Sequence, residues 1–120
     1  MLRGEHFLAN KEQTKLMDGL KKATTEMMVL FMLRKQPMYT YEIMKAIEQV
    51  SNHVLVYNTL YIAINRLCKN GLIEEASKSL TDDNHVRIYY KITDAGNRYL
   101  DYAIQEYHRI SAAIEQVISS

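Results

Sequence analysis

The stretch from Tyr57 to Ile73 contains the side chains best suited to recognising a nucleic acid. An asparagine can pair with adenine and an arginine with guanine, each through two hydrogen bonds, and Asn65 and Arg66 are adjacent here. Lys69 follows them and suits a phosphate group, which positions a protein on DNA without specifying sequence. These residue types predict a helix that enters a major groove, although a solvated surface helix would have the same composition.

The spacing of side chains predicts that this stretch is helical. One face is apolar because large side chains recur at helical intervals, namely Leu60, Ile64 and Leu67, with Ala63 and Cys68 beside them. The opposite face holds the polar side chains Tyr61, Asn65, Arg66 and Lys69. We expect Asn58 or Thr59 to cap the N-terminus of this helix. Gly71 is expected to end it, because glycine accepts a positive φ.

Composition limits the class of protein. The chain has 120 residues, of which 48% are hydrophobic, so it can bury the core of one domain. Its single cysteine cannot form an internal disulfide, and no apolar run reaches the roughly 20 residues that span a bilayer. We therefore expect a soluble cytoplasmic protein without membrane contact. The four histidines lack metal-ligand spacing and no catalytic arrangement stands out, so the sequence predicts no enzyme, cofactor or metal site.

The net charge of +1 gives the chain no general attraction to nucleic acid. The charge is unevenly distributed, because residues 101–120 contain one cation and three anions and residues 1–100 therefore carry a net charge of +3. Any DNA binding must depend on a local basic surface within residues 1–100.

Three helices are predicted ahead of the polar-faced helix, over Lys11–Lys22, Thr24–Leu33 and Tyr39–Val50. The first is an amphipathic arm that either frays or packs on a second subunit. The second is a core helix, capped by Thr24 or Thr25 and ended by Pro37, and the third is capped by Thr40. The connector that follows includes a Val54–Val56 run that could pair briefly as a strand. Two helices, a connector and a polar-faced helix are the order of a helix-turn-helix.

A β-hairpin is predicted after the polar-faced helix, with strands over Leu72–Ser79 and Val86–Thr93 and a turn over Leu80–His85. The second strand alternates, with Val86, Ile88, Tyr90 and Ile92 on one face and Arg87, Tyr89 and Lys91 on the other. A hairpin in this position is the wing of a winged helix-turn-helix.

The last predicted helix runs from Asp94 to about Ile118 and is capped by Thr93. Apolar side chains recur along it at the spacing of a heptad seam. We expect this seam to join two copies of the chain, and the alternative is that the helix folds back on the core. The predicted dimerisation residues are Leu100, Ala103, Ile104, Tyr107, Ile110, Ile114, Val117 and Ile118.

Several short runs together resemble the PadR-type family of transcriptional regulators. They are Pro37–Ile43, Asn58–Tyr61, Arg66–Leu67, Gly71–Ile73 and Arg87–Thr93, followed by Gly96. The single long C-terminal helix resembles the short branch of the family, which includes multidrug-responsive repressors. The resemblance implies a homodimer that represses by binding an inverted repeat in double-stranded DNA and is released by a small hydrophobic or phenolic ligand. It also implies that Asn58–Thr59 and Tyr61 meet DNA and that Tyr89–Tyr90 hold the wing.

The sequence departs from the family pattern at three places. Thr40 stands where the family usually has glycine, and the chain has no tryptophan for the centre of a ligand pore. The aromatic residues that could line an analogous pore are the tyrosines of the last predicted helix, Tyr99, Tyr102 and Tyr107. The expected wing tip is acidic at Asp82–Asp83, which phosphate would repel. We therefore expect the wing either to contact DNA through Lys78, Arg87 and Lys91 or to contribute little to DNA binding.

These observations predict a mainly α fold with a small β-hairpin, that is, a winged helix-turn-helix with a long C-terminal dimerisation helix. The expected division is an arm over residues 1–22, a DNA-binding domain over 23–93 and a dimerisation helix over 94–120. The predicted DNA-binding residues are Tyr41, Lys45, Asn58, Thr59, Tyr61, Asn65, Arg66, Lys69, Lys78, Arg87 and Lys91. The alternative function is a winged helix that binds only proteins.

Overall fold

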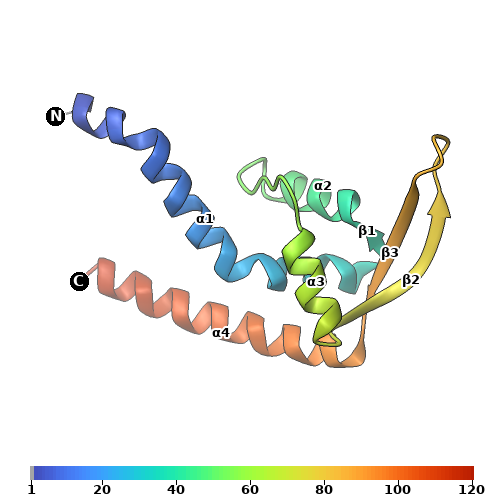
Figure 1. The fold of residues 1–120 in the computed structure, drawn as a ribbon. Helices are drawn as coiled ribbons and strands as arrows, with labels where there is room; N and C mark the ends of the chain where they lie inside the picture. Colours follow the sequence, from blue (N-terminus) through green and yellow to red (C-terminus); the bar gives the residue numbers. More distant parts are fainter. Residues whose placement is uncertain (1) are drawn as a thin grey trace.

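The computed structural model describes the backbone of residues 2–120 and the side chains of residues 11–120. Its elements are the helices α1 (Leu2–Lys35), α2 (Thr40–Val50), α3 (Tyr61–Lys69) and α4 (Asp94–Ile118), and the strands β1 (Met38–Tyr39), β2 (Ile73–Leu80) and β3 (Val86–Ile92) (Figure 1). The predicted fold class, mainly helical with a small β-structure after the third core helix, is confirmed.

Helix α1 is one continuous helix, so the expected break between an arm and a core helix is wrong. Thr24 and Thr25 do not cap a new helix. Their hydroxyls instead donate to the Lys21 carbonyl one turn back, at 3.2 and 2.6 Å, which removes the hydroxyls from competition with the helical backbone. No proline or glycine stands between Lys21 and Thr25, and the helix continues until Pro37 excludes a further turn.

The hydrophobic core lies where α1, α2, α3 and the start of α4 meet. Its fully enclosed side chains are Val29, Leu30, Ile43, Leu60, Leu67, Ile73 and Leu100. The core holds no buried polar or charged side chain among the described residues, so apolar burial fixes the relative positions of the helices.

Helix α2 begins one residue after Tyr39, whose backbone N–H donates to the Glu42 carboxylate at 3.2 Å. The expectation that Thr40 caps this helix is therefore wrong. The connector after α2 contains Asn52 and His53 with φ of 54° and 64°, a left-handed conformation that turns the chain sharply. No strand forms at Val54–Val56, so the short strand expected there is wrong.

The sheet is antiparallel with the order β1–β3–β2, and β3 lies in the middle. The two-residue strand β1, which the sequence did not predict, pairs Met38 with Tyr90 and Tyr39 with Tyr89. Strand β2 pairs with β3 from Ile73 opposite Ile92 outward, and its register shifts between Glu75 and Ser77. The long β2–β3 hairpin projects away from the helices (Figure 1).

Helix α4 is joined to the end of α3 and to α1 by short polar contacts. The Thr93 hydroxyl accepts from the Gly96 N–H at 3.0 Å, which confirms Thr93 as the cap, and donates to the Gly71 carbonyl at 2.7 Å. The Arg34 guanidinium donates to the Asn97 side-chain and backbone oxygens, both at 2.9 Å, and to Asp101 at 2.8 Å. The N-terminal part of α1 and the C-terminal part of α4 then extend from the core on the same side (Figure 1).

Candidate nucleic-acid interface

The exposed face of α3 presents the side chains that the sequence suggested for base contact. Tyr61 is 69% exposed, and Asn65 and Lys69, one and two turns further on, also point to solvent. On the opposite face Ile64 and Leu67 are buried in the core, so the polar face cannot rotate inward without exposing them. The packing therefore fixes which side of α3 a duplex would meet.

The N-terminus of α3 differs from the expected capping. The residue at the N-cap position is Leu60, whose side chain is buried in the core. Thr59 supports this end by accepting the Tyr61 N–H at 3.1 Å, and Asn58 lies exposed just before it. Both predicted residues thus lie at the entrance of α3, but the requirement to bury Leu60 displaces them from the cap.

Arg66 lies on the flank of α3 and turns towards α1. Its guanidinium is 3.4 Å from the carboxylate of Glu26, which is 24% exposed. A base contact by Arg66 would require this ion pair to be exchanged for one with DNA. Base reading by Arg66 stays a prediction, but Asn65 and Lys69 need no such exchange, because neither has a charged partner among the described residues.

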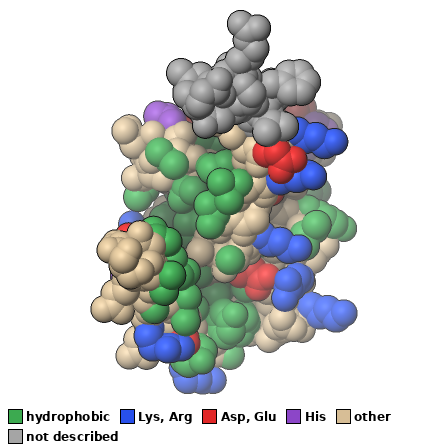
Figure 2. Space-filling model, turned by 90° about the vertical axis from the view of Figure 1, so that its left-hand side faces the viewer, with side chains coloured by type: hydrophobic (Ala, Val, Ile, Leu, Met, Phe, Trp, Pro, Cys, Tyr) green, Lys and Arg blue, Asp and Glu red, His purple; other side chains and the backbone are tan. Residues whose placement is uncertain are grey.

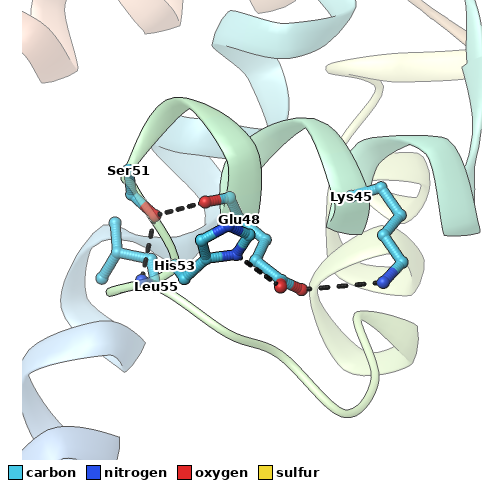
Figure 3. Close-up of polar contacts among 5 residues, drawn as sticks. All are labelled: Lys45, Glu48, Ser51, His53 and Leu55. Carbon is cyan, nitrogen blue, oxygen red and sulfur yellow. Dashed lines mark hydrogen bonds and ion pairs between the residues drawn. The ribbon is translucent and has the colours of Figure 1, made fainter.

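Two further predicted residues lie on α2, one turn apart. The Lys45 ammonium is 5.5 Å from the centre of the Tyr41 ring and 3.9 Å from the Glu48 carboxylate. Glu48 also accepts from His53 Nδ1 at 2.9 Å, so one carboxylate joins α2 to the connector (Figure 3). The hydrogen bond from His53 lowers the pKa of Glu48, with Lys45 contributing less. This hydrogen bond therefore ties His53, whose backbone is left-handed, to α2 and fixes the start of the connector that leads to α3.

The cations of the wing are mostly paired. Lys78 lies 3.6 Å from Glu75 and Lys91 lies 3.5 Å from Glu74, all on exposed surface. The guanidinium of Arg87 stacks on a tyrosine ring of β1 at 4.6 Å. That ring, Tyr39, packs edge-on against Tyr89 of β3 at 5.3 Å, whereas Tyr90 packs against the core. The role expected of Tyr89–Tyr90 in holding the wing stays a prediction.

The tip of the wing is acidic in the structure. Asp83 accepts a hydrogen bond from the Thr81 hydroxyl, and its carboxylate lies 3.2 Å from Nδ1 of His85. The hydrogen bond from the Thr81 hydroxyl lowers the pKa of Asp83, which favours the ionised form of this carboxylate. A phosphate that approached this tip would meet negative charge and be repelled.

Sequence reasoning missed one residue on the face of α3. Ile62 is 72% exposed, in the first turn of the helix and beside the polar side chains. Helical periodicity indicates which apolar residues face the core, and it does not indicate an apolar residue that faces solvent. The signal that would have found Ile62 is that its position falls opposite Ile64 and Leu67 on the helix.

A groove of about 1030 Å³ lies between α1 and α4, and its walls include the three predicted tyrosines Tyr99, Tyr102 and Tyr107. A smaller hollow of about 330 Å³, lined largely by methionines and other apolar side chains, adjoins it near the connector. Figure 2 shows hydrophobic side chains gathered on this side of the molecule. Arg66, on the flank of α3, also lines the larger groove, so this groove reaches the edge of the exposed face of α3.

The predicted dimerisation residues divide into two groups. Leu100 is fully buried in the core of its own chain, so its assignment to a dimer surface is wrong, and half-buried Ile104 packs on the same core. Ala103 beside it is also half-buried. Further along α4, large side chains remain 45–70% exposed, namely Tyr107, Ile110, Ile114, Val117 and Ile118. The first half of α4 therefore packs on the core and the second half does not, and dimerisation through the second half stays a prediction.

Other site chemistry is limited. Cys68 is half-buried on the inner flank of α3, and burial raises the pKa of its thiol. Among the described side chains, no three His, Cys, Asp or Glu residues are grouped to hold a metal ion. None of the described helices is long and apolar enough to cross a bilayer.

Helices α2 and α3, followed by the β2–β3 hairpin, define a winged helix-turn-helix. The sequence matches the model of the transcriptional regulator PadR-like family over residues 29–102. Because this match covers more than half of the chain, the protein belongs to the PadR-like family. The chain is a DNA-binding transcriptional regulator, a class distinct from enzymes.

Solved structures of other regulators share this fold. A transcriptional regulator from Clostridium thermocellum is 28% identical, with a TM-score of 0.72 over 82% of this chain and 96% of that chain. A PadR family regulator from Eggerthella lenta shares the fold at 24% identity, with a TM-score of 0.70 over 92% and 91%. A PadR-like regulator from Bacillus cereus shares it at 22%, with a TM-score of 0.68 over 85% and 98%. No curated protein matches the sequence.

Proposed function

We propose that this protein is a cytoplasmic repressor that binds an inverted-repeat operator as a homodimer and is released by a small hydrophobic or phenolic ligand. The observation that carries the proposal is the exposed face of α3, where Tyr61, Asn65 and Lys69 point away from the core. An amide and a cation on an exposed helix are suited to base edges and phosphates of a major groove.

Dimerisation is supported by the apolar second half of α4. A helix surface with Ile110, Ile114 and Val117 about half exposed or more is covered most simply by its own copy. Helix α1 adds Leu16 and Leu20, each 63% exposed, and Leu20 lines the groove between the two helices. A dimer built here would place two α3 helices on one duplex, as a palindromic operator requires.

The dimer is tested by Ile114→Glu, which would place a charge in the proposed interface. We expect this variant to be a monomer at micromolar concentration in sedimentation equilibrium, whereas the unmodified chain is a dimer. The matched control is Gln105→Glu, which adds the same charge at an exposed polar position of α4 and should leave the dimer intact. A monomeric unmodified chain would remove the dimer from the proposal.

The ligand is assigned to the groove between α1 and α4. Its tyrosine hydroxyls can form hydrogen bonds with the hydroxyl of a phenol or the carboxylate of a phenolic acid. Its apolar walls can cover an aromatic ring. A ligand here would touch both helices that are proposed to form the dimer, so it could alter the spacing of the two α3 helices. Tyr102→Ala should make such a ligand less effective at releasing the protein from its operator, and it should leave affinity for the operator unchanged.

DNA binding is tested with a fragment from upstream of the coding region, titrated by fluorescence anisotropy at several salt concentrations. We expect affinity to fall steeply as salt rises, because cations of the protein displace counterions from phosphates. Addition of hydrophobic cations and phenolic acids then tests release. The acidic wing favours one other function, a winged helix that binds only proteins. DNA binding that is absent or insensitive to salt would favour that alternative.

A further inference from the structure

Ile62 is an aliphatic side chain held in water on the face of α3 that is proposed to meet DNA. It is 72% exposed and is the second residue of the helix. The other aliphatic side chains of this fully described helix, Ala63, Ile64 and Leu67, are buried. Asn65 lies one turn further along the helix, beside it. The exposed face of α3 therefore combines hydrogen-bonding groups with one apolar group.

Neither folding nor helix formation accounts for isoleucine at this position. The side chain joins no part of the buried core, so it contributes little apolar burial within the chain. A β-branched residue also has a lower helix propensity than the alanine, lysine or glutamate that would suit an exposed position.

The chemistry of the major groove supplies an apolar partner. The edges of the base pairs present donors and acceptors, and the one apolar group there is the C5-methyl group of thymine. Helix-turn-helix proteins contact base edges with residues near the N-terminus of the recognition helix, and Ile62 lies in the first turn of α3. Its polar neighbours Tyr61 and Asn65 would hold the helix in register with the same bases.

We propose that Ile62 determines specificity by contacting the methyl group of a thymine in each operator half-site. This inference rests on the proposed function, because it requires α3 to enter the major groove. The contact is apolar and therefore selects thymine over cytosine and over uracil, which lacks the methyl group. It adds sequence information that the phosphate contacts of Lys69 cannot supply.

The test removes the Ile62 side chain and the thymine methyl group, first separately and then together. Thymines of the operator are replaced one at a time by uracil, and binding is measured for the unmodified protein and for Ile62→Ala. We expect one thymine in each half-site at which uracil weakens binding of the unmodified protein by about 4-fold, as burial of one methyl group predicts. The same replacement should leave binding by Ile62→Ala unchanged.

Controls separate failure of this inference from failure of the proposed function. Val54→Ala shortens another exposed aliphatic side chain, which lies in the connector and is 63% exposed. This variant should keep the full response to uracil. Circular dichroism melting should show that both variants remain folded. Equal responses of the unmodified protein and Ile62→Ala at every thymine, or no response at any, would overturn the inference while leaving DNA binding intact. Failure of the unmodified protein to bind the operator would overturn the proposed function, and this inference with it.

Discussion

Gly96 is the position at which the joint between α4 and the rest of the fold can be tested most directly. A Cβ atom added there would lie 2.1 Å from the carbonyl oxygen of Leu72 and 2.7 Å from Cγ1 of Ile92. An ordinary contact between carbon and oxygen is about 3.3 Å, so Gly96→Ala must move the start of α4 by about 1 Å. The atom in its way is backbone, which cannot turn aside as a side chain would.

The cost of this movement can be worked out from the contacts that it disturbs. Overpacking of a tight site costs about 1–3 kcal/mol. The hydrogen bonds from Thr93 to Gly71 and Leu72, at 2.7 and 3.1 Å, contribute about 1 kcal/mol each and would lengthen. Alanine returns up to about 1 kcal/mol through its higher helix propensity. We expect a net loss of about 2 kcal/mol, which for a chain of this size lowers Tm by about 8 °C.

The measurement is thermal unfolding followed by circular dichroism at one fixed protein concentration. The matched control is Gly19→Ala in α1, where the added Cβ meets no described atom within 4 Å. That variant should gain about 0.5–1 kcal/mol, because glycine within a helix is less favourable than alanine. If Gly96→Ala were as stable as the unmodified protein, the close approach of α4 to Leu72 would be wrong.

Three further variants test other parts of the structure. Arg34→Met removes three hydrogen bonds to Asn97 and Asp101 and should cost about 1–2 kcal/mol, measured by urea unfolding with Lys35→Met as the control. Glu48 has a lowered pKa in the folded state, so its contribution to stability is present above its unfolded pKa and is lost as pH falls through the folded value. His53→Asn should therefore lose less stability than the unmodified protein between pH 5 and pH 3. Lys69→Ala should weaken binding equally on all DNA sequences and reduce the salt dependence by about one counterion.

The buried and exposed faces of α3 could be predicted from the sequence because they follow from local spacing. Leu67 is buried and Asn65 is exposed as their positions on a helix require. The partner of Arg66 could not be predicted in this way, since Glu26 is distant in sequence and meets it only when α1 crosses α3. Whether a cation is free for DNA depends on such tertiary contacts.

Two errors in the elements have local causes. The pair Thr24–Thr25 has the composition of a helix cap, but the same hydroxyls can also bond one turn back within a helix, as they do here. Strand β1 has only two residues and exists because Met38 and Tyr39 meet β3. No period can be detected in two residues, so this strand depends on tertiary structure alone.

A periodic pattern also could not show which part of α4 is buried in its own chain and which part is exposed. Leu100 and Ile114 belong to one apolar seam, yet Leu100 is fully buried in its own chain and Ile114 is 53% exposed. The sequence shows that a seam exists, while the extent of the core determines where along the helix it becomes available to a second copy. The predicted interface therefore begins beyond Ile104.

Hydroxyl-radical footprinting of the operator, with the number of bound chains measured in parallel, tests the central claim most directly. If two α3 faces bind one duplex through a dimer joined along α4, two chains should bind. They should protect two patches about one helical turn apart on the same side of the DNA. A single protected patch with one bound chain, or no protection at low salt, would contradict the account.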